Sequence, residues 1–218
     1  MMKYMINILN RTDKRILFII FSLILVLCAL ALNRVIISDQ IYFNTYSDQL
    51  GHDRIEALIH YRRRLEWIGY LFVPAGLAAK LFLITLSIQV GFLFMNNRIR
   101  LRSVFHVVLV SESVFIIAHI LRIIILYLMD LNTFEDINNF YPLSIVSVLK
   151  AESVRGWFIY PLKMANLFTF IYFFVLANGL SVVLKRTPAR MLLFTLSTFG
   201  VCLSLWIMII MFISIYLS

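Results

Sequence analysis

Five long apolar runs alternate with shorter polar segments along the chain, a pattern typical of a membrane protein. A helix of about 20 mostly apolar residues is long enough to cross the hydrocarbon core of a bilayer. We therefore predict an all-α, polytopic helical membrane protein, with five transmembrane helices in a single domain of 218 residues. The predicted spans cover approximately residues 16–32, 71–95, 103–129, 160–184 and 191–217.

Two other segments, residues 50–66 and 140–150, are apolar on one side or too short to span a bilayer. We predict that both form amphipathic helices at the membrane interface. In the second, Pro142 suits the first turn of such a helix. In the first, one helical stripe carries the apolar side chains Ile55, Leu58, Tyr61, Leu65 and Ile68.

Three consecutive arginines, Arg62, Arg63 and Arg64, fall largely outside that apolar stripe. Long basic side chains cover apolar surface with their stems and keep their charge among lipid head groups. We expect these arginines to anchor the helix at the membrane surface. The alternative is a basic patch that recruits a protein partner.

The composition agrees with a membrane protein, because 62% of the residues are hydrophobic and only 14% are charged. The net charge of +9 comes from bases at the ends of the apolar runs, where they orient helices and meet anionic lipids. We therefore expect membrane lipids as partners and no nucleic acid. The basic head, the loop at 96–102 and the turn at 185–190 share one side if the N-terminus is cytoplasmic in a bacterial inner membrane.

Three cations inside the apolar runs are predicted to lie at one depth. A rise of 1.5 Å per residue places Lys80, Arg122 and Lys163 roughly 27–33 Å from the basic residues at the opposite ends of their spans. Each side chain can reach its own interface separately. Alternatively, the three converge on a phosphate or carboxylate in the outer leaflet, with Asn166 as a further donor.

Nearer the middle of the membrane lie Glu112 and Gln89, each roughly 15 Å from the end of its span. We predict a hydrogen bond between them that joins the second and third helices. Helical spacing also places Glu112, His119 and Arg122 within one face, where they form either packing contacts or a relay for protons or a charged ligand.

No catalytic motif is found, and we expect a protein that is not an enzyme and uses no cofactor or metal. The two cysteines, Cys28 and Cys202, lie inside apolar runs without metal-ligand spacing. We interpret both as small apolar residues rather than as a disulfide.

The segments FYPLSIVSVL and WFIYPLKMANLFTFIYFFVLANGL, within residues 140–180, resemble the membrane domain of the Yip family. These are five-span proteins related to Rab/Ypt-interacting proteins, and the likeness is greatest to bacterial members. It rests on the Pro-Leu-Ser segment, the aromatic residue before the span, the Asn-Leu-Phe step and the exit at Asn178, Gly179 and Leu180.

The resemblance implies a non-enzymatic membrane organiser or a subunit of a larger membrane assembly, with a protein partner or a homo-oligomer. Two alternatives remain open from the residues themselves. One is a transport or channel component with a polar path of Glu112, His119 and Arg122. The other is a binder of, or an enzyme acting on, a phosphorylated lipid in the outer leaflet.

Overall fold

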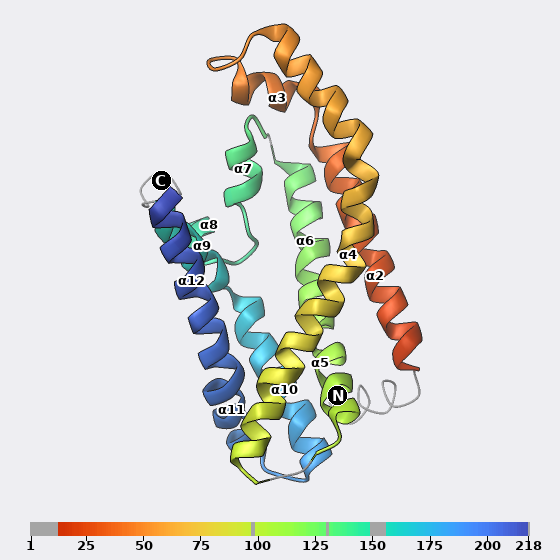
Figure 1. The fold of residues 1–218 in the computed structure, drawn as a ribbon, viewed down its shortest axis with the longest axis vertical. Helices are drawn as coiled ribbons and strands as arrows, with labels where there is room; N and C mark the ends of the chain where they lie inside the picture. The colour runs from red at the N-terminus through yellow and green to blue at the C-terminus, as the bar shows by residue number, and fades with distance from the viewer. Residues whose placement is uncertain (1–12, 97–98, 130, 149–155, 218) are drawn as a thin grey trace.

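The computed structural model describes residues 13–96, 99–129, 131–148 and 156–217, and these form an elongated bundle of helices (Figure 1). Most of the basic head and part of the basic loop at 96–102 lie outside the described residues. In chain order the elements are α2 (Lys14–Ala31), the π-helical turn η1 (Leu32–Ile36), α3 (Asp39–Tyr46), α4 (His52–Phe94), α5 (Leu101–Ser111), α6 (Ser113–Leu128), α7 (Phe134–Asn139), α8 (Ile145–Val148), α9 (Gly156–Met164), α10 (Leu167–Leu184), α11 (Pro188–Thr195), the π-helical turn η3 (Leu196–Gly200) and α12 (Val201–Leu217).

Five helical segments are long and apolar enough to cross a membrane, which confirms the all-α, polytopic fold class. The fourth begins later than the predicted residue 160, because α9 and α10 are separate helices on either side of Ala165 and Asn166. The five segments are Lys14–Ile36, His52–Phe94, Leu101–Leu128, Leu167–Leu184 and Pro188–Tyr216.

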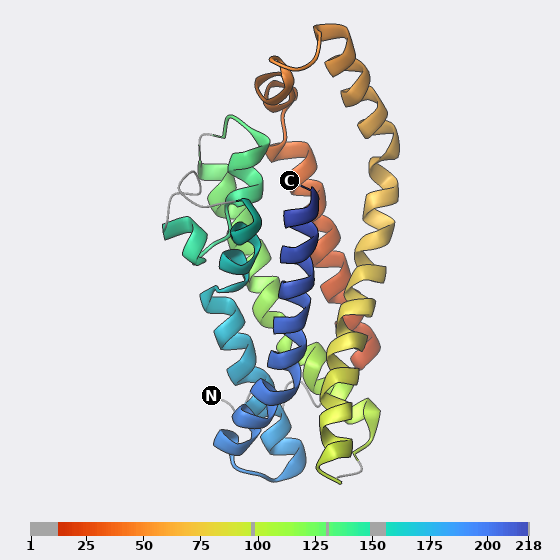
Figure 2. The ribbon, with the colours of Figure 1, turned by 60° about the vertical axis from the view of Figure 1, so that its left-hand side comes forward.

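The segment at residues 50–66 is not a separate interfacial helix, and that prediction is wrong. Helix α4 runs without interruption from His52 to Phe94, straight through Pro74. Its 43 residues make a rod of about 65 Å, twice the roughly 30 Å of the hydrocarbon core. The first turns of α4 therefore project beyond the bilayer, with α3 packed against them (Figure 2).

The buried side of this projecting part also differs from the predicted stripe. Ile55 and Ile59 are buried against α3, whereas Leu58 and Tyr61 are 42% and 65% exposed. An amphipathic pattern identifies an apolar face but not what covers it. Here a short helix of the same chain covers part of that face in place of lipid.

The second predicted interfacial segment, residues 140–150, forms less helix than expected. Only the short helix α8 lies within it, beginning three residues after Pro142, and residues 149 and 150 are outside the described part of the chain. Leu143 adopts a positive φ of 56°. The preceding helix α7 starts at a capping box in which Thr133 and Asp136 bond each other's backbone N–H groups.

The main core joins α2, α4, α5, α6, α10 and α11. Two glycines allow close helix approach within it. A Cβ atom on Gly179 would lie 2.5 Å from a methyl group of Val107, and one on Gly91 would lie 2.1 Å from a methyl group of Thr198 in η3. In contrast, α12 contributes no buried side chain among its described residues, and it contacts chiefly α9 and η3.

Replacement of Gly91 by alanine is expected to destabilise the bundle by about 1–3 kcal/mol, because the added methyl group overpacks the contact with Thr198 and Phe194. Thermal unfolding of the full chain in mild detergent measures this. The matched control is Gly76→Ala in the same helix, where no described atom lies within 4 Å of the added Cβ. Equal midpoints for Gly91→Ala and Gly76→Ala would contradict the close approach.

Candidate functional site

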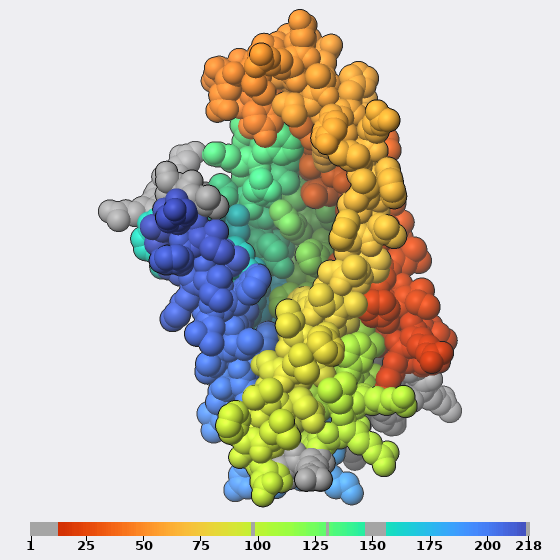
Figure 3. All heavy atoms as spheres, viewed as in Figure 1, coloured from red at the N-terminus to blue at the C-terminus, as the bar shows by residue number. Residues whose placement is uncertain are grey.

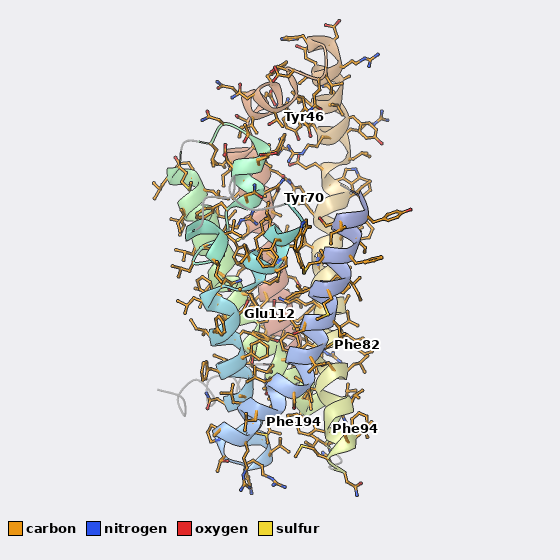
Figure 4. The ribbon with its side chains drawn as sticks, turned by 90° about the vertical axis from the view of Figure 1, so that its left-hand side faces the viewer. Tyr46, Tyr70, Phe82, Phe94, Glu112 and Phe194 are labelled. Carbon is orange, nitrogen blue, oxygen red and sulfur yellow. The ribbon has the colours of Figure 1, made fainter. Side chains whose placement is uncertain are left out.

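A buried carboxylate lies at the centre of the bundle, where Glu112 separates α5 from α6 (Figure 4). Glu112 is only 3% exposed. Its Oε1 accepts a hydrogen bond from Nζ of Lys80 on α4 at 2.6 Å, and the same ammonium lies 4.0 Å from the centre of the Phe115 ring. An ionised carboxylate in such a place needs a counter-charge, and Lys80 supplies it.

The predicted hydrogen bond between Glu112 and Gln89 is wrong. Gln89 instead donates from Nε2 to the backbone oxygen of Ile99 at 2.9 Å, and so ties the end of α4 to the start of the third span. Gln89 lies only five residues, or about 8 Å, from the end of α4, whereas Glu112 lies about 16 Å from the start of α5. Lys80, about 21 Å from the end of α4, reaches Glu112 with its long side chain.

Two further cations lie beyond this pair. Arg122 donates from Nη2 to the backbone oxygen of Ile137 at 2.8 Å, and its guanidinium lies 5.9 Å from the centre of the Tyr141 ring. Lys163 of α9 is within electrostatic range of Arg122. His119, one turn before Arg122, is within range of both Lys80 and Arg122. We call these five residues, Lys80, Glu112, His119, Arg122 and Lys163, the intramembrane cluster.

The predicted layer of three cations is thus divided. Arg122 and Lys163 lie within electrostatic range of each other. Lys80 forms an ion pair with Glu112 instead. Lys80 departs from the predicted layer because the helices are tilted (Figure 1) and because a lysine side chain is long enough to reach Glu112.

Asn166 lies next to Lys163 but serves a structural purpose. It is 3% exposed, and its Oδ1 caps α10 by accepting from the backbone N–H of Thr169 at 2.8 Å. Its Nδ2 donates to the backbone oxygen of Lys163, also at 2.8 Å. Because both ends of the amide are engaged, Asn166 holds Lys163 in place rather than offering a free donor to a ligand.

The three consecutive arginines point in different directions. Arg62 and Arg63 turn toward η1 and α3, where they bond the side chains of Asn33 and Asp39. Arg64 is exposed. Two of the three arginines predicted to anchor the helix therefore bond polar groups of the same chain.

Tyr172 and Tyr141 are the residues that sequence reasoning missed. Tyr172 is fully buried beside Phe115, and its hydroxyl has no hydrogen-bond partner among the described residues. Burial raises the pKa of Tyr141, while Arg122 opposes the rise and Glu112 adds to it. A tyrosine in an otherwise apolar span was the available signal for Tyr172, whereas nothing in the sequence linked Tyr141 to Arg122.

Comparison with models of known protein families, with curated proteins and with solved structures finds no match to this chain.

Loss of the Lys80 ammonium is expected to destabilise the protein by about 1–3 kcal/mol, because Lys80→Ala leaves the Glu112 charge buried without a partner. The double variant Lys80→Ala/Glu112→Gln should recover part of this loss, since the remaining amide is uncharged. Chemical unfolding in mixed micelles provides the comparison, with Lys185→Ala as the control for loss of a lysine. Strictly additive effects of the two single substitutions would mean that the pair is not coupled.

Proposed function

We propose that this integral membrane protein binds the phosphate group of an anionic lipid at Arg122 and Lys163, and acts as a non-enzymatic organiser of the membrane or of an assembly within it. One observation carries the proposal. The intramembrane cluster holds three basic residues, Lys80, Arg122 and Lys163, and one carboxylate, and that carboxylate is paired with Lys80. Arg122 and Lys163 have no carboxylate partner among the described residues.

The unused donors support an anionic ligand. Arg122 uses Nη2 for the Ile137 carbonyl, but its buried Nε has no partner within the described chain. A cation removed from water is costly unless an anion or strong acceptor faces it. Guanidinium groups bind phosphate in a forked geometry, and a neighbouring ammonium adds a point charge.

The surroundings favour a lipid as the source of that phosphate. Arg122 itself is half-buried where α6 meets the backbone of α7. In the space-filling view, α12 stands apart from the upper half of α4, and the surface of α6 lies recessed between them (Figure 3). A recess bordered by apolar helices admits acyl chains more readily than a free ion.

The membrane and the orientation belong to the same proposal. We propose a bacterial cytoplasmic membrane with a cytoplasmic N-terminus, because basic residues then accumulate on the inner side. In that orientation the projecting end of α4, together with Arg122 and Lys163, faces the outer side. The lipid bound at Arg122 then belongs to the outer leaflet.

Membership of a larger assembly is the second candidate function, and the fifth span favours it. None of the described side chains of α12 is buried, and large apolar residues such as Leu205 and Phe212 are 56% and 73% exposed. Although α12 contacts α9 and η3, its outward face is exposed and is available for another helix. The Yip-like resemblance, which implies such an organiser, points in the same direction.

The lipid proposal predicts that an anionic phospholipid copurifies with the full chain in mild detergent. The double variant Arg122→Ala/Lys163→Ala should carry about tenfold less of it, because charge-assisted bonds to phosphate are lost. Mass spectrometry of extracted lipids and bound proteins measures both the lipid and any partner. The control is Arg102→Ala, which removes an exposed arginine from the opposite end of the same span. Unchanged lipid content in the double variant would refute the site.

A further inference from the structure

A second polar site lies at the far end of the molecule, where the first turns of α4 face η1 and α3 (Figure 1). It encloses a cavity of about 260 Å³, close to the lower limit of small-molecule pockets. Glu66 stands 28 residues before the end of α4, or roughly 42 Å, which exceeds the thickness of the hydrocarbon core. The cavity therefore lies outside the hydrocarbon. We call it the α3–α4 cavity.

One wall is built by the π-helical turn at the end of α2. Such single π turns recur at functional sites because the inserted residue redirects side chains. Here the turn aims Asn33 and Arg34 at α4. Asn33 donates to the hydroxyl of Tyr70, that hydroxyl donates to Glu66, and Glu66 pairs with Arg34 at 3.3 Å. The side chain of Glu66 is only 8% exposed, so this wall is a fixed network.

The opposite wall is held by a second ion pair. Nη2 of Arg63 lies 2.7 and 2.8 Å from the two carboxylate oxygens of Asp39 at the start of α3. Both carboxylates that line the cavity, Asp39 and Glu66, are thus satisfied by an arginine of their own.

Arg62 is the third arginine of the cavity, and it lies between these walls. Nη2 bonds the side-chain oxygen of Asn33, and the guanidinium lies 5.3 Å from the centre of the Tyr42 ring. No carboxylate in the described part of the chain pairs with it. A guanidinium has five N–H donors, and Arg62 uses some of them on Asn33 and Tyr42, so other donors remain for a ligand. The cavity carries three arginines against two carboxylates, a surplus of one positive charge.

We propose that the α3–α4 cavity binds a small oxyanion, a carboxylate or a phosphate ester, whose charged group is seated on the guanidinium of Arg62. Tyr42 and the apolar side chains of Ile37 and Ile59 then contact the rest of the ligand. The position beyond the hydrocarbon gives two sources for such a group, a dissolved anion and a lipid head group. This site shares no residue with the intramembrane cluster.

Phosphate titration of the full chain in mild detergent tests the proposal. At about ten times its dissociation constant, inorganic phosphate should raise the thermal midpoint by about 3–5 °C at constant ionic strength. The response should disappear in Arg62→Gln, which keeps a donor for Asn33 but lacks the charge. It should persist in Arg64→Gln, the matched control that removes the exposed neighbour, and in Arg122→Gln, which alters only the intramembrane cluster.

The source of the ligand is read from a second titration, with short-chain phosphatidylglycerol below its micellar concentration. In the Arg122→Ala/Lys163→Ala background, which removes the other proposed lipid site, a larger shift than with phosphate assigns the α3–α4 cavity to a lipid head group. A smaller shift assigns it to a dissolved anion. Arg62→Lys, which keeps the charge but not the forked donors, should respond weakly and shows that the cavity still folds. Absence of any phosphate response in the wild type, or an unchanged response in Arg62→Gln, would overturn the proposal.

Discussion

A carboxylate in the middle of a helical bundle needs an opposite charge, and the pair between Glu112 and Lys80 meets that need. The pair connects α4 to the point where α5 passes into α6, so it fixes the relation of the second span to the third. Glu112 is the only acidic residue of the intramembrane cluster, so no acidic member remains to pair with the other cations. Arg122 and Lys163 are left with a surplus of positive charge, and the proposed lipid site depends on that surplus.

Two π-helical turns in the described part of the chain explain how otherwise regular spans form specialised contacts. In the fifth span, η3 brings Thr198 against Gly91, where only a glycine leaves enough room. In the first span, η1 turns Asn33 and Arg34 toward α4 and supplies a wall of the α3–α4 cavity. Thr198 of η3 packs directly against α4 near its end, whereas Asn33 and Arg34 of η1 reach α4 through their side chains.

The sequence predicted the fold class because a span needs only length and apolar composition, and both are readable from the apolar runs. It did not predict that residues 50–66 continue α4, because a helix lying on lipid and a helix covered by α3 require the same amphipathic pattern. Glu112 was identified as a buried acid, but its partner was not. That choice depends on helix tilt and side-chain reach, as Lys80 illustrates.

Other parts of the sites depend on local geometry that residue types do not encode. Asn166 has the chemistry of a ligand donor, and only the break between α9 and α10 makes it a helix cap. Asn33 and Arg34 stand at the end of an apolar run, where polar residues are ordinary. Their contacts with Glu66 and Arg62 arise because η1 turns them toward α4.

The length of α4 has a mechanical consequence. The helix is continuous from His52 to Phe94, although Pro74 removes one backbone hydrogen bond near its middle. A tilt of about 5° around the tight contact at Gly91 displaces the other end of this rod of about 65 Å by roughly 5 Å. Bilayer thickness and lateral pressure both act on the tilt of a long span. Because Arg62, Arg63 and Glu66 all belong to α4, such a tilt would move them relative to η1, which ends a different span.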